Sequence, residues 1–353
     1  NGESTTTFIS PHLYDFKSRI WLKNRFITLS EIKRYEKQIS KLRVNLSLFE
    51  VLTLIYILAA TKVKSSYNLV ESGLLFKKDS TNIFKNPLLQ ACTNINKQHL
   101  EWISPATINE VCKQKVGYLN NQTNIYIGKQ KPKTLKIIKK ILKKNKSKIT
   151  YPSNWRIIYK KDNIYYKDQR HKITIRSNYI HSKGLIDNLG LAIKIALDLK
   201  ISPKIIEKTI PKIFFEGRLQ YINRGKLRKY VHKNEKILLD GAHSNTSGKN
   251  LYDYLKSLKL PIYCIWGMQK NKLPKNFLKN FKGIFKKIVT IKIPNEPNSC
   301  SAEQLKLIAL KQNYKVEIAN NFKEALKKIT SNKPKVICFM GSLYLIGSVL
   351  KKN

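Results

Sequence analysis

Polar side chains that could bind a metal ion or a phosphate group come at or shortly after the ends of four predicted strands. These side chains are Glu71, His99, Asp240, His243 and Ser342. Because parallel strands bring their carboxyl ends to one edge of a sheet, the side chains that follow them can meet there. A carboxylate, an imidazole and a hydroxyl at such an edge predict a magnesium and phosphate site. Taken one at a time, each residue also fits an ordinary structural role, such as capping a helix or closing a turn.

The amino-terminal half alternates between helical and strand-like patterns. Apolar residues recur at helical spacing in two segments, and short apolar runs bounded by turn residues predict three strands. The helices are predicted at 29–38 and 46–60, and the strands at 67–71, 88–94 and 125–128. Thr107, with Glu110 three residues later, is typical of a helix start. This alternation predicts an α/β layer with a mainly parallel sheet.

The rest of the chain predicts a second domain. A lysine-rich amphipathic helix is predicted at 131–148, residues 150–182 alternate as in a peripheral antiparallel hairpin, and further helices are predicted at 188–199 and after Ser202. Five short apolar strands with helices between them follow Pro211. They are predicted at 236–240, 262–266, 288–293, 314–318 and 336–340. We therefore expect an α/β protein of two domains, residues 1–212 and a smaller, doubly wound domain at residues 213–353.

The chain carries a strong positive charge. Lys and Arg number 68 against 22 Asp and Glu, which gives a formal net charge of +46. A nucleic-acid footprint should be a local basic stripe with aromatic side chains between the charges, whereas these lysines run through the whole chain. We interpret the charge as compositional bias and expect no specific nucleic-acid partner. A nucleic-acid-binding protein remains the alternative that this charge leaves open.

The cysteines and the apolar segments indicate the compartment. The five cysteines are odd in number, form no Cys-x-x-Cys pair and mostly lie in apolar stretches, which is typical of reduced proteins. The longest apolar stretch, 51–60, has about half the length of a membrane span, and no charged-then-apolar leader precedes it. We therefore expect a cytoplasmic protein without a membrane partner.

Eight short segments stand in a characteristic order along almost the whole chain. They are Ser10–Leu13, Phe49–Glu50, Glu71–Leu74 with Asp79–Asn82, His99, Lys113–Gly117, Phe215–Gln220, Leu239–Ser244 and Gly341–Leu345. This order resembles the motifs of the folylpolyglutamate synthase/dihydrofolate synthase family, part of the wider group of ATP-dependent Mur-type amide ligases. Each motif is short by itself, so the resemblance depends on their order.

The resemblance implies a ligase with an amino-terminal nucleotide-binding α/β domain and a carboxyl-terminal Rossmann-like domain. The reaction joins L-glutamate to the carboxylate of dihydropteroate or tetrahydrofolate and converts ATP to ADP and phosphate, as part of folate biosynthesis and one-carbon metabolism. Because a carboxylate is a poor electrophile, phosphorylation to an acyl phosphate provides a leaving group, and the glutamate amine then attacks. The protein would position the ligands and neutralise phosphate charge with Mg²⁺ and cationic side chains. A monomer is expected.

The resemblance also implies roles for individual residues. The metal-binding positions are Ser4, Glu71, His99 and Lys115, of which the last three are also the catalytic positions. Lys115 matches the lysine that the family carries as a carbamate, although the bare sequence also fits a plain solvent-exposed lysine. The positions implied to bind ATP are Gly2, Ser4, Asn188, Arg218, Asp240 and His243. The positions implied to bind substrate are Ser10, Pro11, His12, Asp79, Thr81 and Asn82.

The clearest departure from the family lies in the phosphate loop. The family's Gly-Thr-Asn-Gly-Lys-Gly-Ser-Thr corresponds here only to residues 1–5, without the lysine, the preceding strand or the following helix. Such a loop directs backbone N–H groups, a helix N-terminus and a lysine at the phosphates. Smaller departures occur at Gln98, Glu216 and Ser244. We therefore expect the architecture to be retained and catalysis to be impaired. A truncated, non-catalytic homologue is the alternative, and a ligase of cell-wall precursors would need a further domain.

Overall fold

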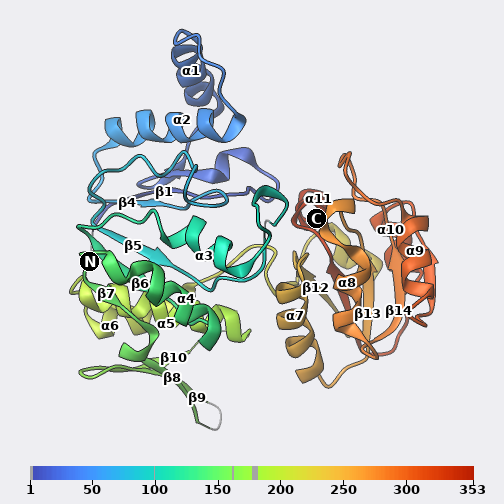
Figure 1. The fold of residues 1–353 in the computed structure, drawn as a ribbon. Coiled ribbons are helices and arrows are strands. Elements are labelled where there is room, and N and C mark those ends of the chain that lie inside the picture. Colours follow the sequence, from blue (N-terminus) through green and yellow to red (C-terminus); the bar gives the residue numbers. More distant parts are fainter. Residues whose placement is uncertain (1–2, 99, 161–162, 177–181) are drawn as a thin grey trace. The chain divides into compact units, whose positions relative to one another are not determined.

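The computed structural model of this chain describes residues 3–98, 100–160, 163–176 and 182–353. The chain divides into two units (Figure 1). Unit 1 consists of Asn1–Arg176 and Asp187–Ile210, and unit 2 consists of Ser177–Ile186 and Pro211–Asn353. Both units combine helices with parallel strands, so the α/β fold class predicted from the sequence is confirmed.

Unit 1 begins with a four-stranded sheet in the order β3-β2-β1-β4. Its strands are β1 (Thr5–Phe8), β2 (Ile20–Leu22), β3 (Arg25–Phe26) and β4 (Tyr67–Val70). β1 pairs antiparallel with β2 and parallel with β4. Thr6 and Phe8 are the buried residues of β1, and the ring of Phe8 stacks on Tyr56 with a centroid distance of 5.3 Å.

Two helices pack on this sheet at the positions predicted from their periodicity. They are α1 (Leu29–Ser40) and α2 (Leu48–Val63). Both begin at a reciprocal capping box, formed by Thr28 with Glu31 and by Ser47 with Glu50. Their buried faces join the strands in one apolar cluster that includes Phe8, Ile20, Tyr35, Leu52 and Tyr56.

The second part of unit 1 is a parallel three-stranded sheet in the order β5-β6-β7. Its elements are β5 (Leu89–Cys92), α3 (Ile108–Val116), β6 (Asn124–Ile127), α4 (Pro132–Ile141) and β7 (Ile149–Thr150). Thr107 caps α3 by accepting a hydrogen bond from the backbone N–H of Glu110, as predicted. The lysine-rich helix is shorter than the predicted 131–148, because α4 ends at Ile141 and the chain turns to enter β7.

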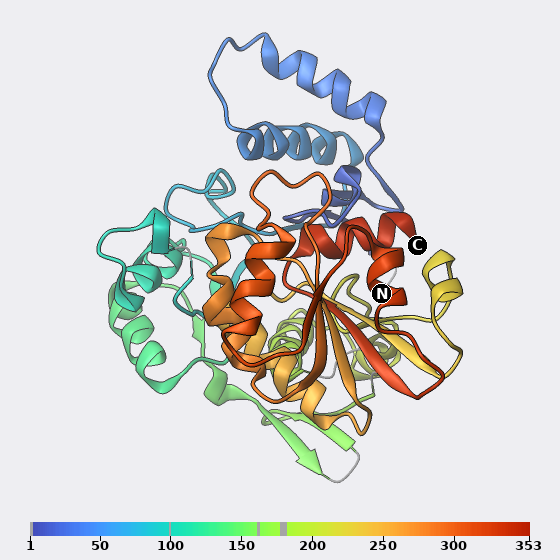
Figure 2. The same cartoon turned by 90° about the vertical axis from the view of Figure 1, so that its right-hand side faces the viewer.

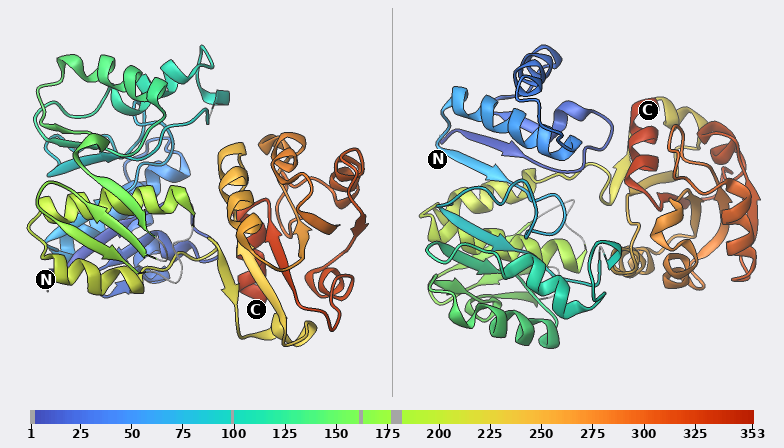
Figure 3. Two further views of the ribbon diagram at one scale, coloured as in Figure 1. Left: turned by 90° about the horizontal axis from the view of Figure 1, so that it is seen from below. Right: turned by 45° about the horizontal axis from the view of Figure 1, so that its top comes forward.

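The third part of unit 1 contains the predicted antiparallel segment. It forms three strands rather than a two-stranded hairpin, namely β8 (Arg156–Lys160), β9 (Asn163–Lys167) and β10 (Lys172–Ile175). Two helices follow, α5 (Lys183–Asp198), of which the residues from Asp187 onward belong to unit 1, and α6 (Pro203–Thr209), which Ser202 caps as predicted. Figure 3 shows these strands and helices beside β5–β7.

Unit 2 is a six-stranded sheet in the order β11-β12-β16-β13-β14-β15. Its strands are β11 (Gln220–Ile222), β12 (Glu235–Asp240), β13 (Ile262–Trp266), β14 (Phe285–Thr290), β15 (Val316–Ile318) and β16 (Lys335–Met340). All pairs are parallel except β11 with β12. The five parallel strands confirm the predicted pattern. The sequence did not indicate β11, because three residues are too few to show a period.

Helices cover both faces of the unit 2 sheet (Figure 2). They are α7 (Asn245–Ser257), α8 (Pro274–Leu278), α9 (Ala302–Leu310), α10 (Phe322–Lys327) and α11 (Leu343–Lys352). The described residues also form the 3-10 helices η1 (Phe16–Arg19), η2 (Leu100–Trp102), η3 (Leu142–Lys144), η4 (Pro152–Asn154), η5 (Ile210–Lys212), η6 (Lys226–Tyr230), η7 (Lys270–Lys272) and η8 (Lys279–Phe281). Within the described residues, every helix is too short or too polar to cross a bilayer. The five cysteines are free thiols.

Candidate functional site

The carboxyl ends of β1 and β4 bring Ser10 next to Glu71. The two strands are in register from Thr5 opposite Tyr67 onward, so the residues that follow them emerge together. The backbone N–H of Ser10 donates a hydrogen bond to Glu71 Oε2 at 2.9 Å, and Glu71 is exposed. A carboxylate oxygen, the kind of ligand that Mg²⁺ prefers, thus stands at the edge of the sheet where the sequence predicted it.

Ser4 lies at the opposite end of the same two strands. Its Oγ accepts a hydrogen bond from the backbone N–H of Ser66 at 3.2 Å, and its carbonyl accepts one from Tyr67. Glu71 comes five residues after Ser66, which corresponds to about 17 Å of extended strand. Oxygen ligands of Mg²⁺ or Ca²⁺ lie about 2.0–2.6 Å from the ion. The expectation that Ser4 and Glu71 share a metal is therefore wrong, because residues 5–8 form β1 rather than a phosphate loop and its helix.

The loop after β1 carries three of the predicted substrate contacts, Ser10, Pro11 and His12. Arg19 Nε donates to His12 Nδ1 at 3.0 Å, and the ring of His12 lies edge-on to Phe16. Burial and the positive charge of Arg19 lower the pKa of His12 below its usual 6.5. The ring is consequently neutral at pH 7, with Nδ1 acting as an acceptor.

Asp79 organises the connection between β4 and β5. Its Oδ2 accepts hydrogen bonds from the backbone N–H groups of Gly73 and Leu74 at 2.8 and 3.1 Å. Its Oδ1 accepts from the N–H and the hydroxyl of Thr81 at 3.0 and 2.6 Å, and its carbonyl accepts from the N–H of Asn82. Both carboxylate oxygens therefore fold the loop, which is a structural role that the sequence motif alone did not reveal.

Removing the carboxylate of Asp79 should loosen this loop. In Asp79→Ala the N–H groups of Gly73, Leu74 and Thr81 lose their acceptor, so we expect their amide exchange to accelerate more than about tenfold. The amides of β6 should not change. Hydrogen exchange with residue resolution measures this effect, and Glu36→Ala, at an exposed glutamate of the same unit, is the control. Equal exchange in Asp79→Ala and the unaltered chain would contradict the assignment.

Lys115 reaches the same connection from the last turn of α3. Its Nζ donates a hydrogen bond to the carbonyl of Leu74 at 2.8 Å. Burial lowers the pKa of the Lys115 amine, while the nearby Cys92 and Asp79 oppose that shift. Lys115 is thus a half-buried lysine rather than a plain solvent-exposed one. A lowered pKa increases the fraction of neutral amine, the form that can react with carbon dioxide.

The remaining predicted site residues of unit 1 are either exposed or outside the described residues. Gly2 and His99 lie outside the described residues, and Asn188 is exposed on α5. Among the residues that the structure describes, no group of three or more His, Cys, Asp or Glu side chains could hold a metal ion. The described part of the predicted magnesium site therefore consists of Glu71 and Lys115.

Asp240 is buried at the carboxyl end of β12 in unit 2. Its Oδ2 accepts a hydrogen bond from the N–H of Leu219 at 3.0 Å, and its Oδ1 accepts one from Ala242 at 2.8 Å. Burial raises the pKa of Asp240, whereas the Arg218 guanidinium and these two hydrogen bonds act against that rise. The carboxylate thus fastens the segment carrying Arg218 to the end of β12. The sequence singled out both residues but not their connection.

His243 follows in the turn between β12 and α7. Its Nδ1 lies 2.8 Å from the carbonyl oxygen of Gly241, and its backbone N–H donates to Ser247 Oγ at 3.1 Å. Ser244 caps α7 in a reciprocal pair with Ser247. Serine at position 244 is therefore compatible with the helix start. The predicted residues of unit 2 meet at the carboxyl end of one strand, where open α/β sheets bind ligands.

The Gly341-Ser342 pair after β16 closes the same edge of the sheet. Gly341 has φ of 111°, and a Cβ there would lie 2.5 Å from the carbonyl oxygen of Gly267. Only glycine fits this position without strain. Ser342 is buried and caps α11 by accepting a hydrogen bond from the N–H of Tyr344. Both residues have a structural role in the described chain.

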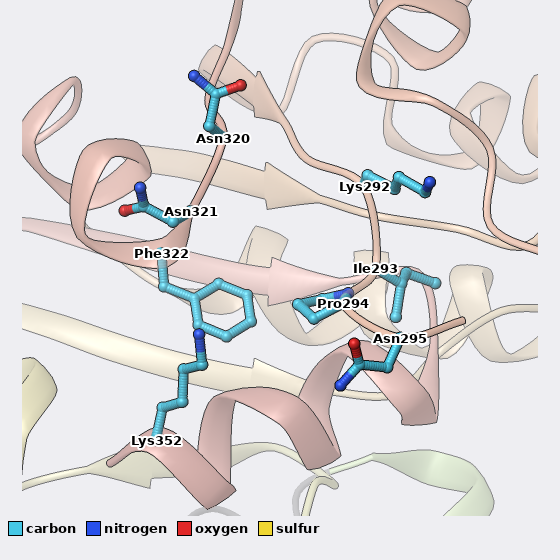
Figure 4. A pocket seen from close by; sticks show the side chains of 8 residues that line it. All are labelled: Lys292, Ile293, Pro294, Asn295, Asn320, Asn321, Phe322 and Lys352. Carbon is cyan, nitrogen blue, oxygen red and sulfur yellow. The ribbon is translucent and has the colours of Figure 1, made fainter. Parts of the chain in front are cut away.

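A separate cavity of about 290 Å³ lies in unit 2 after β14 and β15 (Figure 4). Lys292 and Lys352 line it together with Asn320, Asn321 and Phe322, and Lys352 Nζ lies 5.7 Å from the centre of the Phe322 ring. None of the described residues of the predicted site lines this cavity. It is therefore distinct from the Asp240 cluster.

Comparisons with known proteins agree with the resemblance drawn from the motifs. Residues 223–352 match the sequence family described as "Dihydrofolate synthetase, C-terminal domain". A search of curated protein sequences gave no match. The family match includes Asp240 and His243 and covers most of unit 2.

Solved structures match the whole chain in fold. A folylpolyglutamate synthase from Thermotoga maritima is 21% identical, with a TM-score of 0.82, and the match covers 99% of this chain and 82% of that one. The E. coli FolC in complex with DHPP and ADP is 18% identical with a TM-score of 0.84, and the match covers 99% of this chain and 82% of that one. The same values hold for a bifunctional folylpolyglutamate synthase/dihydrofolate synthase from Yersinia pestis complexed with AMPPNP and Mn ion. Residues 223–352 thus carry the signature of the dihydrofolate synthetase C-terminal domain, and the chain as a whole has the two-domain fold of folylpolyglutamate synthase/dihydrofolate synthase.

Proposed function

We propose that this chain is an ATP-dependent ligase that joins L-glutamate to the carboxylate of a pteroate or folate through an acyl phosphate. The match of residues 223–352 to the dihydrofolate synthetase family carries the proposal, because that segment includes the strand end where Asp240 and His243 meet. The similarity in fold to structures holding ADP, or AMPPNP and Mn ion, supports ATP and a divalent metal as ligands.

The donor chemistry of unit 1 fits a magnesium ion. Glu71 offers an exposed carboxylate at a strand end, and a carbamate on Lys115 would add a second anionic oxygen donor close to Leu74. Mg²⁺ bound there would neutralise phosphate charge as the substrate carboxylate is phosphorylated. We propose His99 as a further ligand on the sequence motif alone.

The residues of the chain itself would chiefly position the ligands. Asp240 keeps the Arg218 segment at the end of β12, which places a permanent cation at the ligand-binding edge of unit 2. In unit 1 the neutral His12 and the backbone of the Ser10 loop provide hydrogen-bonding groups for a flat, polar ring such as a pterin. We also propose that the protein acts as a monomer in the cytoplasm.

The test measures ADP formation that requires both glutamate and dihydropteroate or tetrahydrofolate. A chimera that carries an intact strand, phosphate loop and helix from a folylpolyglutamate synthase is assayed beside residues 1–353. We expect one ADP per glutamyl product in the chimera. Glu71→Gln and His99→Ala in that chimera should each lower the rate more than about tenfold, because water rarely replaces a lost hard ligand well. Glu36→Gln, an exposed glutamate on α1, is the control.

A non-catalytic homologue is the second candidate, favoured by the position of Ser4 at the amino end of β1. A chimera with restored Mg-ATP affinity but no substrate-dependent ADP formation would support this candidate and contradict the ligase.

A further inference from the structure

Residues 129–148, which contain α4, carry the densest cluster of positive charge in the chain. One residue in two is a lysine there, whereas about one in five is Lys or Arg over the whole chain. Every one of these lysines is exposed. They form what we call the lysine surface: Lys129, Lys131, Lys133, Lys136, Lys139, Lys140, Lys143, Lys144, Lys146 and Lys148. A compositional bias spread evenly over the protein does not account for this density.

Helical spacing places the lysines of α4 on one face. The opposite face is apolar and packs into unit 1, where the side chain of Ile138 is completely buried. Four of the lysines recur at intervals of three and four residues and therefore form one line along the helix, namely Lys133, Lys136, Lys140 and Lys143. At 1.5 Å per residue this line is about 15 Å long.

No carboxylate in this part of the sequence compensates the charge. Asp and Glu are absent from residues 111–161. Within the described parts of the chain, none of the ten lysines takes part in an ion pair. The neighbouring helix α3, which packs against α4 (Figure 1), has one carboxylate, Glu110, and it accepts a hydrogen bond from Gln114 Nε2 at 2.7 Å. The positive charge of the lysine surface therefore faces the solvent uncompensated.

Other helices of the same chain do contain compensating carboxylates. On α5, Lys194 pairs with Asp198 four residues later, and α1, α2 and α7 each contain at least one Asp or Glu. On α4 the residues four apart are instead two cations, such as Lys136 and Lys140. Like charges at this spacing destabilise a helix. A polyanion bound along α4 would relieve that repulsion.

The side chains around the lysines indicate which kind of polyanion fits. Residues 129–148 are all described, and none of their large apolar side chains is exposed, so this surface has nothing to insert between lipids. The ring of Tyr151 is half-buried and has Lys139 Nζ 5.1 Å from its centre, so it offers little area for stacking on a base. A line of single charges without apolar or aromatic groups matches a chain of phosphates.

From these observations we infer that the lysine surface binds the sugar–phosphate backbone of a nucleic-acid strand, by charge and without sequence preference. RNA and DNA share this backbone, so both should bind. The alternative that the net charge left open thus applies to one surface of unit 1. None of the ten lysines belongs to the predicted ligase site, and the inference does not depend on the proposed function.

Fluorescence anisotropy with an oligothymidylate and an oligouridylate of about 16 nucleotides tests the inference without ATP or substrate. The variant carries glutamine at the four positions of the line, as Lys133→Gln, Lys136→Gln, Lys140→Gln and Lys143→Gln. We expect it to bind both strands at least tenfold more weakly at about 50 mM salt. Each phosphate contact on a single strand contributes about 0.7 to the slope of log affinity against log salt. The slope should therefore become shallower by about 2 to 3.

The matched control neutralises four exposed lysines on helices that contain a glutamate, with the same net charge as the variant. Its substitutions are Lys33→Gln and Lys37→Gln on α1, and Lys204→Gln and Lys208→Gln on α6. We expect it to weaken binding less than about threefold, because these lysines form no continuous line. Glutamine favours helices about as well as lysine, and circular dichroism checks that both proteins fold.

Four outcomes would overturn the inference. Absence of measurable binding to either strand by the unaltered chain is the first, and a loss in the α4 variant no larger than in the control is the second, because net charge alone would then explain binding. A preference of more than about fivefold for one strand would indicate contacts beyond the shared backbone. Tighter binding to vesicles of phosphatidylserine and phosphatidylcholine than to either strand would make a membrane the partner.

Discussion

Residues 1–353 alone are expected to bind Mg-ATP at least about a hundredfold more weakly than a chimera that carries an intact strand, phosphate loop and helix ahead of them. Ser4, the residue matched to the loop hydroxyl, lies at the amino end of β1 beside Ser66, and Thr5–Phe8 continue as a strand. The lysine and the helix N-terminus of the loop are therefore not supplied by these residues. Each charge-assisted contact contributes about 1.5–3 kcal/mol, so two lost contacts account for the expected difference.

Calorimetric titration of Mg-ATP into both proteins measures this difference. The matched control is the chimera with the loop lysine changed to alanine. Its dissociation constant for Mg-ATP should lie between those of the chimera and of residues 1–353. Dissociation constants for the chimera and for residues 1–353 that agree within about tenfold would show that residues 1–353 bind the nucleotide without the loop.

Lys335→Met should destabilise unit 2 by about 3 kcal/mol, because it leaves the carboxylate of Glu235 buried without its cation. Lys335 Nζ lies 3.3 Å from Glu235 Oε1, and the two side chains are 4% and 0% exposed. Glu235 keeps three neutral donors in the variant, the hydroxyl of Thr330 and the N–H groups of Ser331 and His232. Because these donors still stabilise the buried carboxylate, the expected loss of stability lies at the lower end of the range for broken buried ion pairs.

Hydrogen exchange of β12 and β16 under native conditions measures the free energy of unfolding of unit 2. The control is Lys333→Met, at an exposed lysine just before β16. This variant should change the free energy of unfolding of unit 2 by less than about 0.5 kcal/mol. Equal stability of the two variants would show that the buried pair contributes no more than a surface lysine.

The carboxylate of Glu235 also makes the stability of unit 2 depend on pH. Burial alone would raise the pKa of Glu235, but the hydrogen bonds from Thr330, Ser331, His232 and Lys335 outweigh burial and lower it. A folded pKa below the unfolded value contributes stability above the unfolded pKa, and this contribution is lost as the pH falls through the folded pKa. The unaltered chain should therefore lose stability below about pH 4.3, with a shallower decline in Glu235→Gln.

The sequence by itself determined the elements and the order in which they occur. β4 lies at Tyr67–Val70 as its apolar run predicted, and Thr107 and Ser202 cap the helices that follow them. The carboxylates after β4 and β12 also stand at strand ends as expected. These features were predictable because caps and strand periods depend on side chains within a few residues of each other.

Only the tertiary structure decided which of these residues meet. Ser4 and Glu71 lie at opposite ends of one strand pair because the register of β1 and β4 joins residues about 62 positions apart, which no local pattern encodes. Asp79 uses its carboxylate to fold a loop, and Asp240 holds Leu219 and the segment of Arg218. That β4 and β5 belong to different sheets of unit 1 was likewise decided only in the assembled structure, because pairing is a property of neighbouring strands and not of the strand's own sequence.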